Sequence, residues 1–159
     1  MSRFVVAALG AVCLAFVSPA GAVTDVTSEP VSFTLPAGQC ADLPSTVSVS
    51  GTGTAIIRVH SSTDAGGQSH DHVAVTITGT ATDSLGGTYR FNYHQSVAVE
   101  ATTDFPFVVH ITDHFNLVGG GAASQIHTFF NLELLVTSPT SDEVLSIKFH
   151  GDPDTCDPL

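Results

Sequence analysis

The sequence contains few basic residues: four Lys and Arg stand against fifteen Asp and Glu, which gives a formal net charge of −11. Proteins that bind nucleic acid or an anionic membrane surface do so through clustered cationic side chains. A chain this acidic is repelled by both, so these two classes of partner are excluded. After the N-terminal segment no apolar run is long enough to span a bilayer, and we expect no membrane span in the processed protein.

Sequence signatures of catalysis are absent as well. The chain has no Gly-x-Ser-x-Gly nucleophile motif, no glycine-rich phosphate loop and no His-Glu-x-x-His pair of a zinc protease. Nothing in the sequence therefore indicates a particular reaction, and a non-enzymatic role is favoured over an enzymatic one.

The N-terminus has the pattern of a secretory signal peptide. Arg3 precedes an apolar run from Phe4 to Val17, and Ala20 and Ala22 place small residues at positions −3 and −1 of a cleavage site. We expect cleavage after Ala22, which removes residues 1–22. Residues 23–159 should then form a single secreted β domain in an extracytoplasmic compartment.

Two cysteines remain after this cleavage, Cys40 and Cys156, because Cys13 lies within the expected signal peptide. Exported proteins meet an oxidising compartment, where a remaining pair of cysteines normally forms a disulfide. We therefore predict a Cys40–Cys156 bond that ties the region after the first strand to the C-terminal tail.

Alternation of apolar and polar residues with period two recurs along the chain and indicates β-strands. Turn-forming residues interrupt it, for example in the Asp83–Gly87 segment and at the triple glycine 119–121. Residues 23–29 are polar and are expected to form a loose arm. The predicted strands are Val31–Leu35, Thr46–Thr52, Thr54–His60, His72–Asp83, Thr88–Glu100, Phe107–Val118, Ser124–Thr137 and Glu143–His150.

The fold class that follows is all-β. Long strands joined by short turns favour a small antiparallel β-barrel of about eight strands, wound as an up-and-down meander. A two-sheet β-sandwich is the alternative. Pairing across the Asp83–Gly87 turn places Gly79 opposite Phe91. The alternation predicts a core made from Tyr89, Phe91, Tyr93, Phe107, Val109, Ile111, Phe115, Leu117, Ile126, Phe130, Leu132, Leu134, Leu145, Ile147 and Phe149.

The opposite face of these strands is polar and rich in histidine, of which the chain has eight. Hairpin pairing predicts His94 beside His110, Arg90 beside His114, His110 beside Glu133 and Asn116 beside His127. Imidazole and carboxylate groups that converge in this way bind zinc or copper. The candidate metal ligands are His94, His110 and Glu133, and the candidate ligand-binding residues are Arg90, His114 and Asn116.

Two further features qualify as candidates. His70 and His72 project to one side of an extended segment, as a pair of metal ligands would. Asp113 is the one acid on an otherwise apolar face, so its carboxyl group needs a hydrogen-bond donor, for which Tyr89 and Tyr93 are placed. Asp113 is therefore predicted to be a buried polar residue, in a structural network or as a catalytic acid.

Three functions remain open at this point. The first is a non-enzymatic secreted module that binds a ligand or partner or serves structurally at the cell surface, with no cofactor. The second is a histidine-based protein that binds zinc or copper. The third is a small barrel enzyme that uses Asp113, Arg90 or a histidine.

Overall fold

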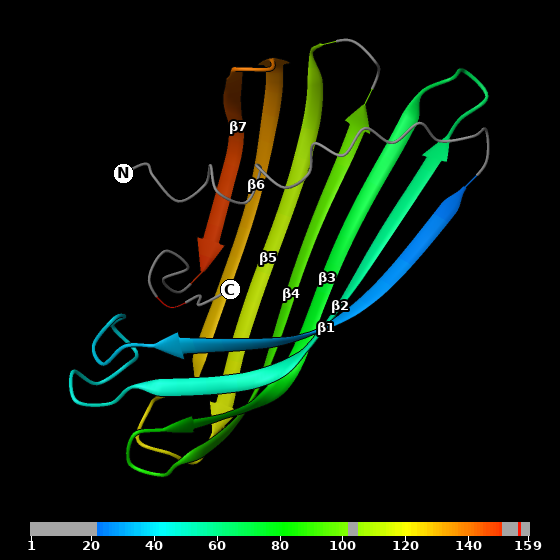
Figure 1. The fold of residues 1–159 in the computed structure, drawn as a ribbon. Coiled ribbons are helices and arrows are strands. Elements are labelled where there is room, and N and C mark those ends of the chain that lie inside the picture. The colour runs from blue at the N-terminus through cyan, green and yellow to red at the C-terminus, as the bar shows by residue number, and fades with distance from the viewer. Residues whose placement is uncertain (1–21, 102–104, 151–155, 157–159) are drawn as a thin grey trace.

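The computed structural model describes residues 22–101, 105–150 and 156. These residues form one antiparallel sheet in which each strand pairs only with its neighbours in sequence (Figure 1). The strands are β1 (Val23–Leu35), β2 (Val49–Thr63), β3 (Ser69–Asp83), β4 (Thr88–Ala101), β5 (Phe107–Gly119), β6 (Ile126–Ser138) and β7 (Ser141–His150). The all-β class and the up-and-down meander are thereby confirmed.

Two predicted strand boundaries were wrong. The segments Thr46–Thr52 and Thr54–His60 form a single strand, β2, which begins at Val49 and continues to Thr63. Gly53 lies within β2 opposite Gly79 and does not break the strand. The polar residues 23–29 also belong to β1 and are not a loose arm, because they pair with β2 along their whole length.

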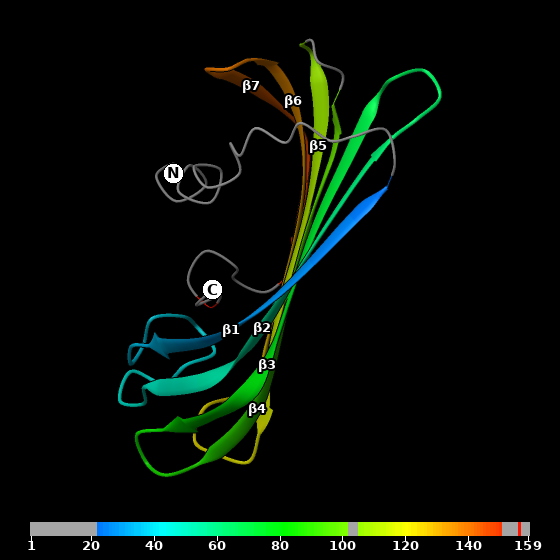
Figure 2. The same cartoon turned by 45° about the vertical axis from the view of Figure 1, so that its right-hand side comes forward.

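The described sheet is open. β1 and β7 are its two edges and do not pair with each other, so closure into a barrel is not found among the described residues. The sandwich alternative is wrong for this part of the chain, since there is one sheet and not two. The strands twist and coil strongly, and the lower ends of β1 to β4 bend to one side when the sheet is seen nearly edge-on (Figure 2).

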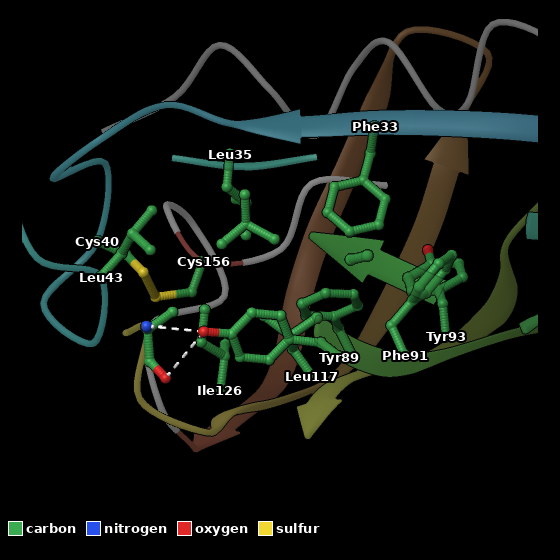
Figure 3. Close-up of a cluster of buried hydrophobic side chains, with 14 of the residues drawn as sticks. Phe33, Leu35, Cys40, Leu43, Tyr89, Phe91, Tyr93, Leu117, Ile126 and Cys156 are labelled. Carbon is green, nitrogen blue, oxygen red and sulfur yellow. Dashed lines mark hydrogen bonds between the residues drawn. A yellow bond between two sulfur atoms is a disulfide. The ribbon is translucent and has the colours of Figure 1, made fainter. Parts of the chain in front are cut away.

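The bent end of the sheet encloses the main core. We call the face that carries Phe33, Phe91 and Phe115 the inner face and the opposite one the outer face. The Phe33 ring meets the Phe91 and Phe115 rings edge-on, with centroids 4.9 and 5.9 Å apart, an arrangement that aromatic pairs prefer. Around them Leu35, Leu43, Tyr89, Tyr93, Leu117 and Ile126 are buried (Figure 3).

The predicted disulfide is present within this core. Cys40 and Cys156 are bonded, with their Cα atoms 5.2 Å apart, and both residues are buried. Cys40 follows β1, and the bond sets Cys156 beside Leu35 and Leu43 on the inner face (Figure 3). The disulfide therefore contributes to the core as apolar volume as well as a covalent link. We call this end of the sheet the disulfide end.

A smaller core covers the other end of the inner face. Val109, Leu132 and Leu134 are buried there, with partly buried residues of β4, β5 and β6 around them. The prediction that β7 joins this core was wrong, because Ile147 is 53% exposed and Phe149 66% exposed. β7 is an edge of the sheet, and no other strand among residues 22–101 and 105–150 pairs with its far side.

The Asp83 carboxylate joins two loops at the disulfide end. Its Oδ1 accepts hydrogen bonds from the amides of Leu85 and Gly87, and its Oδ2 accepts from the Tyr89 hydroxyl and the Ala122 amide, all within 2.9 Å. Led by the bond from Tyr89, these interactions lower the pKa of Asp83 to about 2. One buried carboxylate thus holds the β3–β4 turn against the β5–β6 loop.

This geometry predicts a pH dependence of stability. The pKa of Asp83 is lower in the folded chain than the ordinary value of 3.8, so its stabilisation is complete above about pH 4 and is lost as pH falls towards about 2. We expect Asp83→Asn to lower the melting temperature near pH 7, on the order of 5 °C. The difference from the wild type should shrink as the pH approaches 2, because the wild-type carboxyl group is then protonated too.

Asp64→Asn is the matched control. Asp64 accepts hydrogen bonds from the Gly66 and Gln68 amides in the β2–β3 turn, but it is exposed and binds no second loop. Thermal unfolding of both variants between pH 2 and pH 7 measures the contrast. Equal effects of the two substitutions would show that the link to the β5–β6 loop contributes nothing.

Candidate functional site

The outer face of the sheet carries most of the polar side chains. Directly paired residues in antiparallel strands project to the same face, so the register defines rows that cross the sheet. One row runs Ser32, Thr52, Thr80, Arg90 and Val118, and the next runs Thr34, Ser50, Thr82 and Thr88. Hydroxyl groups therefore dominate the outer face at the disulfide end.

An open groove of about 890 Å³ lies over these two rows. On the outer face it is lined by Ser32, Thr34, Ser50, Thr52, Thr80, Thr82, Thr88, Arg90 and Val118. Phe33 and Tyr89 also border the groove, but both residues are buried and their rings lie in the core of the inner face. The groove thus presents hydroxyl groups, threonine methyl groups, the exposed side chain of Val118 and one guanidinium group, and neither of these two rings is open to it.

Arg90 is the one cationic side chain of this groove. It is exposed, and no carboxylate of the described residues lies within ion-pair distance of it. A guanidinium group offers a planar fork of donors that matches a carboxylate. Hydroxyl groups both donate and accept hydrogen bonds. The groove can therefore hold a small ligand that bears hydroxyl groups and a carboxylate.

A cluster of histidines lies next to the groove on the outer face. We call His94, His114, His127 and His150 the histidine cluster. His94 is paired with His114 across β4 and β5. The rings of His114 and His127 are 4.9 Å apart, and those of His127 and His150 are 5.5 Å apart. Three hairpins of the meander thus bring together histidines that are far apart in sequence.

His114 and His127 share a polar neighbour, Asn116. Nε2 of His114 lies 3.4 Å from Nδ1 of His127 and 3.2 Å from Nδ2 of Asn116, and Oδ1 of Asn116 is hydrogen-bonded to Nδ1 of His127. Burial lowers the pKa of His114, and the nearby His127 and His94 lower it further. His114 is therefore neutral near pH 7.

The predicted metal set of His94, His110 and Glu133 is not brought together. His110 does pair with Glu133, as expected, but His94 lies opposite His114, and His110 lies opposite Ala98. Arg90 likewise lies opposite Val118 and not opposite His114. The observed register sets Asp113 opposite the polar Gln95, whereas the predicted one would have set it opposite an apolar ring. Alternation alone could not distinguish these two registers, because both keep every side chain on its face.

His70 and His72 share the outer face of β3, as expected, but have separate partners. Nε2 of His72 lies 2.8 Å from the Ser96 hydroxyl, and Nε2 of His70 lies 3.8 Å from the Asp64 carboxylate. Among residues 22–101, 105–150 and 156, no three His, Cys, Asp or Glu side chains form a group that could hold a metal ion.

Asp113 lies on the inner face and is partly buried. Its Oδ2 accepts hydrogen bonds from the Tyr93 hydroxyl at 2.6 Å and from Nε2 of Gln95 at 3.1 Å. Arg90 and the histidine cluster lie on the other face of the sheet. The Asp113 carboxylate therefore lies on the opposite face of the sheet from the guanidinium group of Arg90 and the imidazole groups of the histidine cluster.

Comparisons with known proteins do not assign a function. No protein-family model matches the chain, and no curated protein or solved structure matches it significantly. None of the helices in the part that the structure describes has the length and hydrophobicity to cross a membrane. The functional argument therefore rests on the two adjacent features of the outer face, the groove and the histidine cluster.

Sequence reasoning did not find the groove. Arg90 was predicted as a ligand-binding residue, but the hydroxyl groups around it were not. A signal was available, because threonine recurs at every second position from Thr76 to Thr82 and at Thr52 and Thr54. Such repeats mark one polar face of a strand. Whether that face forms a groove depends on how the sheet coils, which alternation does not reveal.

Proposed function

We propose that this protein is a non-enzymatic module that acts outside the cytoplasm and binds a small sugar acid in the groove of its outer face. The observation that carries this proposal is the groove itself, which combines a row of hydroxyl groups with the guanidinium group of Arg90, to which no carboxylate of the described residues is paired. A sugar acid supplies matching hydroxyl groups and one carboxylate.

The chemistry of the lining selects this ligand class. With no aromatic ring open to the groove, the ligand is held by hydrogen bonds and not by ring stacking. The chain's net charge of −11 opposes an anion at long range. Salt screens such repulsion beyond about 8 Å at physiological ionic strength, whereas the contact with Arg90 is direct. A ligand with a single carboxylate and several hydroxyl groups fits best, because it is attracted directly by Arg90 and carries little charge for the rest of the chain to repel.

Export belongs to the same proposal. Residues 1–22 are removed and the mature chain begins at Val23. The Cys40–Cys156 bond supports an extracytoplasmic location, because disulfides persist in oxidising compartments. The intact mass of the exported protein tests this directly, since a chain that starts at Met1 would be heavier by the whole signal peptide.

Arg90→Gln is expected to weaken the binding of glucuronate about 10-fold or more. A hydrogen bond to a charged group contributes about 1.5–3 kcal/mol, and about 1.4 kcal/mol corresponds to a factor of ten in affinity. Chemical-shift titration by NMR measures the affinity and also locates the ligand, because amide signals of the groove residues should move first. Glucose, which lacks the carboxylate, should bind the wild type more weakly than glucuronate.

Arg58→Gln provides the matched control. Arg58 is exposed on the outer face of β2 but does not line the groove, so the substitution changes the net charge equally without touching the site. Its affinity for glucuronate should equal that of the wild type. The proposal fails if glucuronate leaves the groove signals unchanged, or if the two variants lose affinity equally.

A further inference from the structure

The edge of the sheet at β7 presents apolar side chains to solvent. Val144, Ile147 and Phe149 are each more than half exposed. β7 is paired with β6 on one side, and no strand among residues 22–101 and 105–150 pairs with its other side (Figure 1). The backbone N–H and C=O groups along such an edge can pair with a further strand. The β7 edge therefore offers a partner both hydrogen-bonding groups and apolar surface.

A β-bulge determines which face the side chains of β7 take. The register with β6 shifts between Glu133 and Leu134, so that Leu145 is an extra residue without a partner. Beyond such an insertion the two faces of a strand are exchanged. Val144 consequently lies on the inner face together with Ile147, although the two residues are an odd number of positions apart.

The same bulge places two opposite charges on the outer face. Glu143 pairs with Leu135 and Lys148 pairs with Asn131, and both of these partners project to that face. Glu143 and Lys148 are exposed, and neither has an ion-pair partner among the described residues. Five residues of extended strand span about 16 Å. The two charges are therefore too far apart to pair within one chain.

We propose that β7 pairs antiparallel with β7 of a second copy of this chain, which gives a two-fold symmetric dimer. Each contact then occurs twice, and directly paired residues must share a face. In the register that meets both conditions, Val144 of one copy faces Ile147 of the other on the inner face, and Glu143 faces Lys148 on the outer face. A slide by two residues would set Ile147 opposite Asp142 and lose both matches. A slide the other way would set residues of opposite faces against each other beside the bulge.

The balance of forces favours a weak, reversible dimer. Burial of the apolar side chains of β7 drives association. The net charge of −11 opposes it, but salt screens that repulsion beyond about 8 Å at physiological ionic strength. A bulge normally hinders pairing at an edge; here the two bulges meet at the two-fold axis and leave regular strand on either side. One strand edge per copy is a small interface, at the low end of specific contacts, about 1,200 Å² or less.

The dimer is independent of the sugar-acid site. The residues that line the groove belong to β1, β2, β3, β4 and β5 and to none of the residues of β7. Each copy therefore keeps its groove, and loss of the dimer should leave the affinity for glucuronate unchanged.

Charge reversal at the two paired positions tests the proposed register. Sedimentation velocity of the mature protein at physiological salt should show the wild type passing from monomer to dimer as its concentration rises. Glu143→Lys sets lysine against lysine at both contacts, and Lys148→Glu sets glutamate against glutamate. Each variant alone should dimerise at least about 10-fold more weakly than the wild type. An equimolar mixture of the two variants should dimerise again, because both contacts then join a lysine to a glutamate.

Glu29→Lys is the matched control. Glu29 is exposed on β1, the opposite edge of the sheet, so this substitution changes the net charge as much as Glu143→Lys does. It should dimerise at least as strongly as the wild type. The proposal is overturned if the wild type stays monomeric up to its solubility limit, if the mixture of the two variants stays monomeric, or if Glu29→Lys weakens the dimer as much as Glu143→Lys.

Discussion

Removing the disulfide through the double substitution Cys40→Ala and Cys156→Ala is expected to lower the free energy of unfolding by about 4–5 kcal/mol. The two cysteines are 116 residues apart in sequence, and closing so long a loop restricts the unfolded chain strongly in the chain-entropy model. Both sulfur atoms also fill the core between Leu35 and Leu43. Denaturant unfolding of the oxidised wild type and of the variant measures the difference.

Reduced wild-type protein is the control for the lost covalent link, since it keeps the sulfur atoms and loses only the bond. Its free energy of unfolding should lie between that of the oxidised wild type and that of the double variant. The intact mass after alkylation without a reductant tests the premise. Uptake of two alkyl groups by the untreated protein would show that the bond is absent and would remove the basis for the expected loss.

Gly79→Val is expected to destabilise the fold by about 3 kcal/mol, at the upper end of the range for overpacking substitutions. A Cβ atom at this position would lie 2.2 Å from the carbonyl oxygen of Thr52 and 2.5 Å from Cε1 of Phe91. The first of these contacts is with the backbone of β2, which cannot move aside as a side chain can. Urea unfolding would report the change as a lower midpoint with an unchanged slope.

Two further variants separate the causes. Gly79→Ala adds only the Cβ atom, so most of the loss should already appear there if the contact with the backbone is responsible. Thr78→Val adds no comparable volume and lies on the exposed outer face of the same strand, so it should stay within about 0.5 kcal/mol of the wild type. A stable Gly79→Val protein would mean that Gly79 does not face Phe91.

Local sequence was enough to predict the hairpins whose turns are short and well defined. The pairing of Gly79 with Phe91 follows from the Asp83–Gly87 turn, and the pairing of His110 with Glu133 follows from the triple glycine; both are confirmed. The β4–β5 hairpin was predicted in the wrong register. A shift of the β4–β5 register by an even number of residues leaves every side chain on the same face of the sheet. The register that forms therefore depends on how the side chains of the inner face pack across the two strands.

Curvature and the edges of the sheet were not predictable in the same way. The apolar residues of β7 have the pattern of a core strand, yet they remain exposed, because β7 is an edge of the sheet that the described residues form. The groove and the histidine cluster each draw on several strands, so both depend on every intervening register. Residue type identified Arg90, His114 and Asn116 as candidates, whereas the register of β4 with β5 determined which histidines became neighbours.

The neighbour-only pairing of the strands also determines the order in which the molecule can be assembled. Each new hairpin can add to the one before it, because every described strand pairs only with its neighbours in sequence. The Cys40–Cys156 bond is the exception, since it joins the start of the sheet to a residue beyond its last strand. Because Cys156 follows β7 in the chain, this bond cannot form before the last strand has been synthesised, and once formed it links the first loop of the sheet to the segment beyond its last strand.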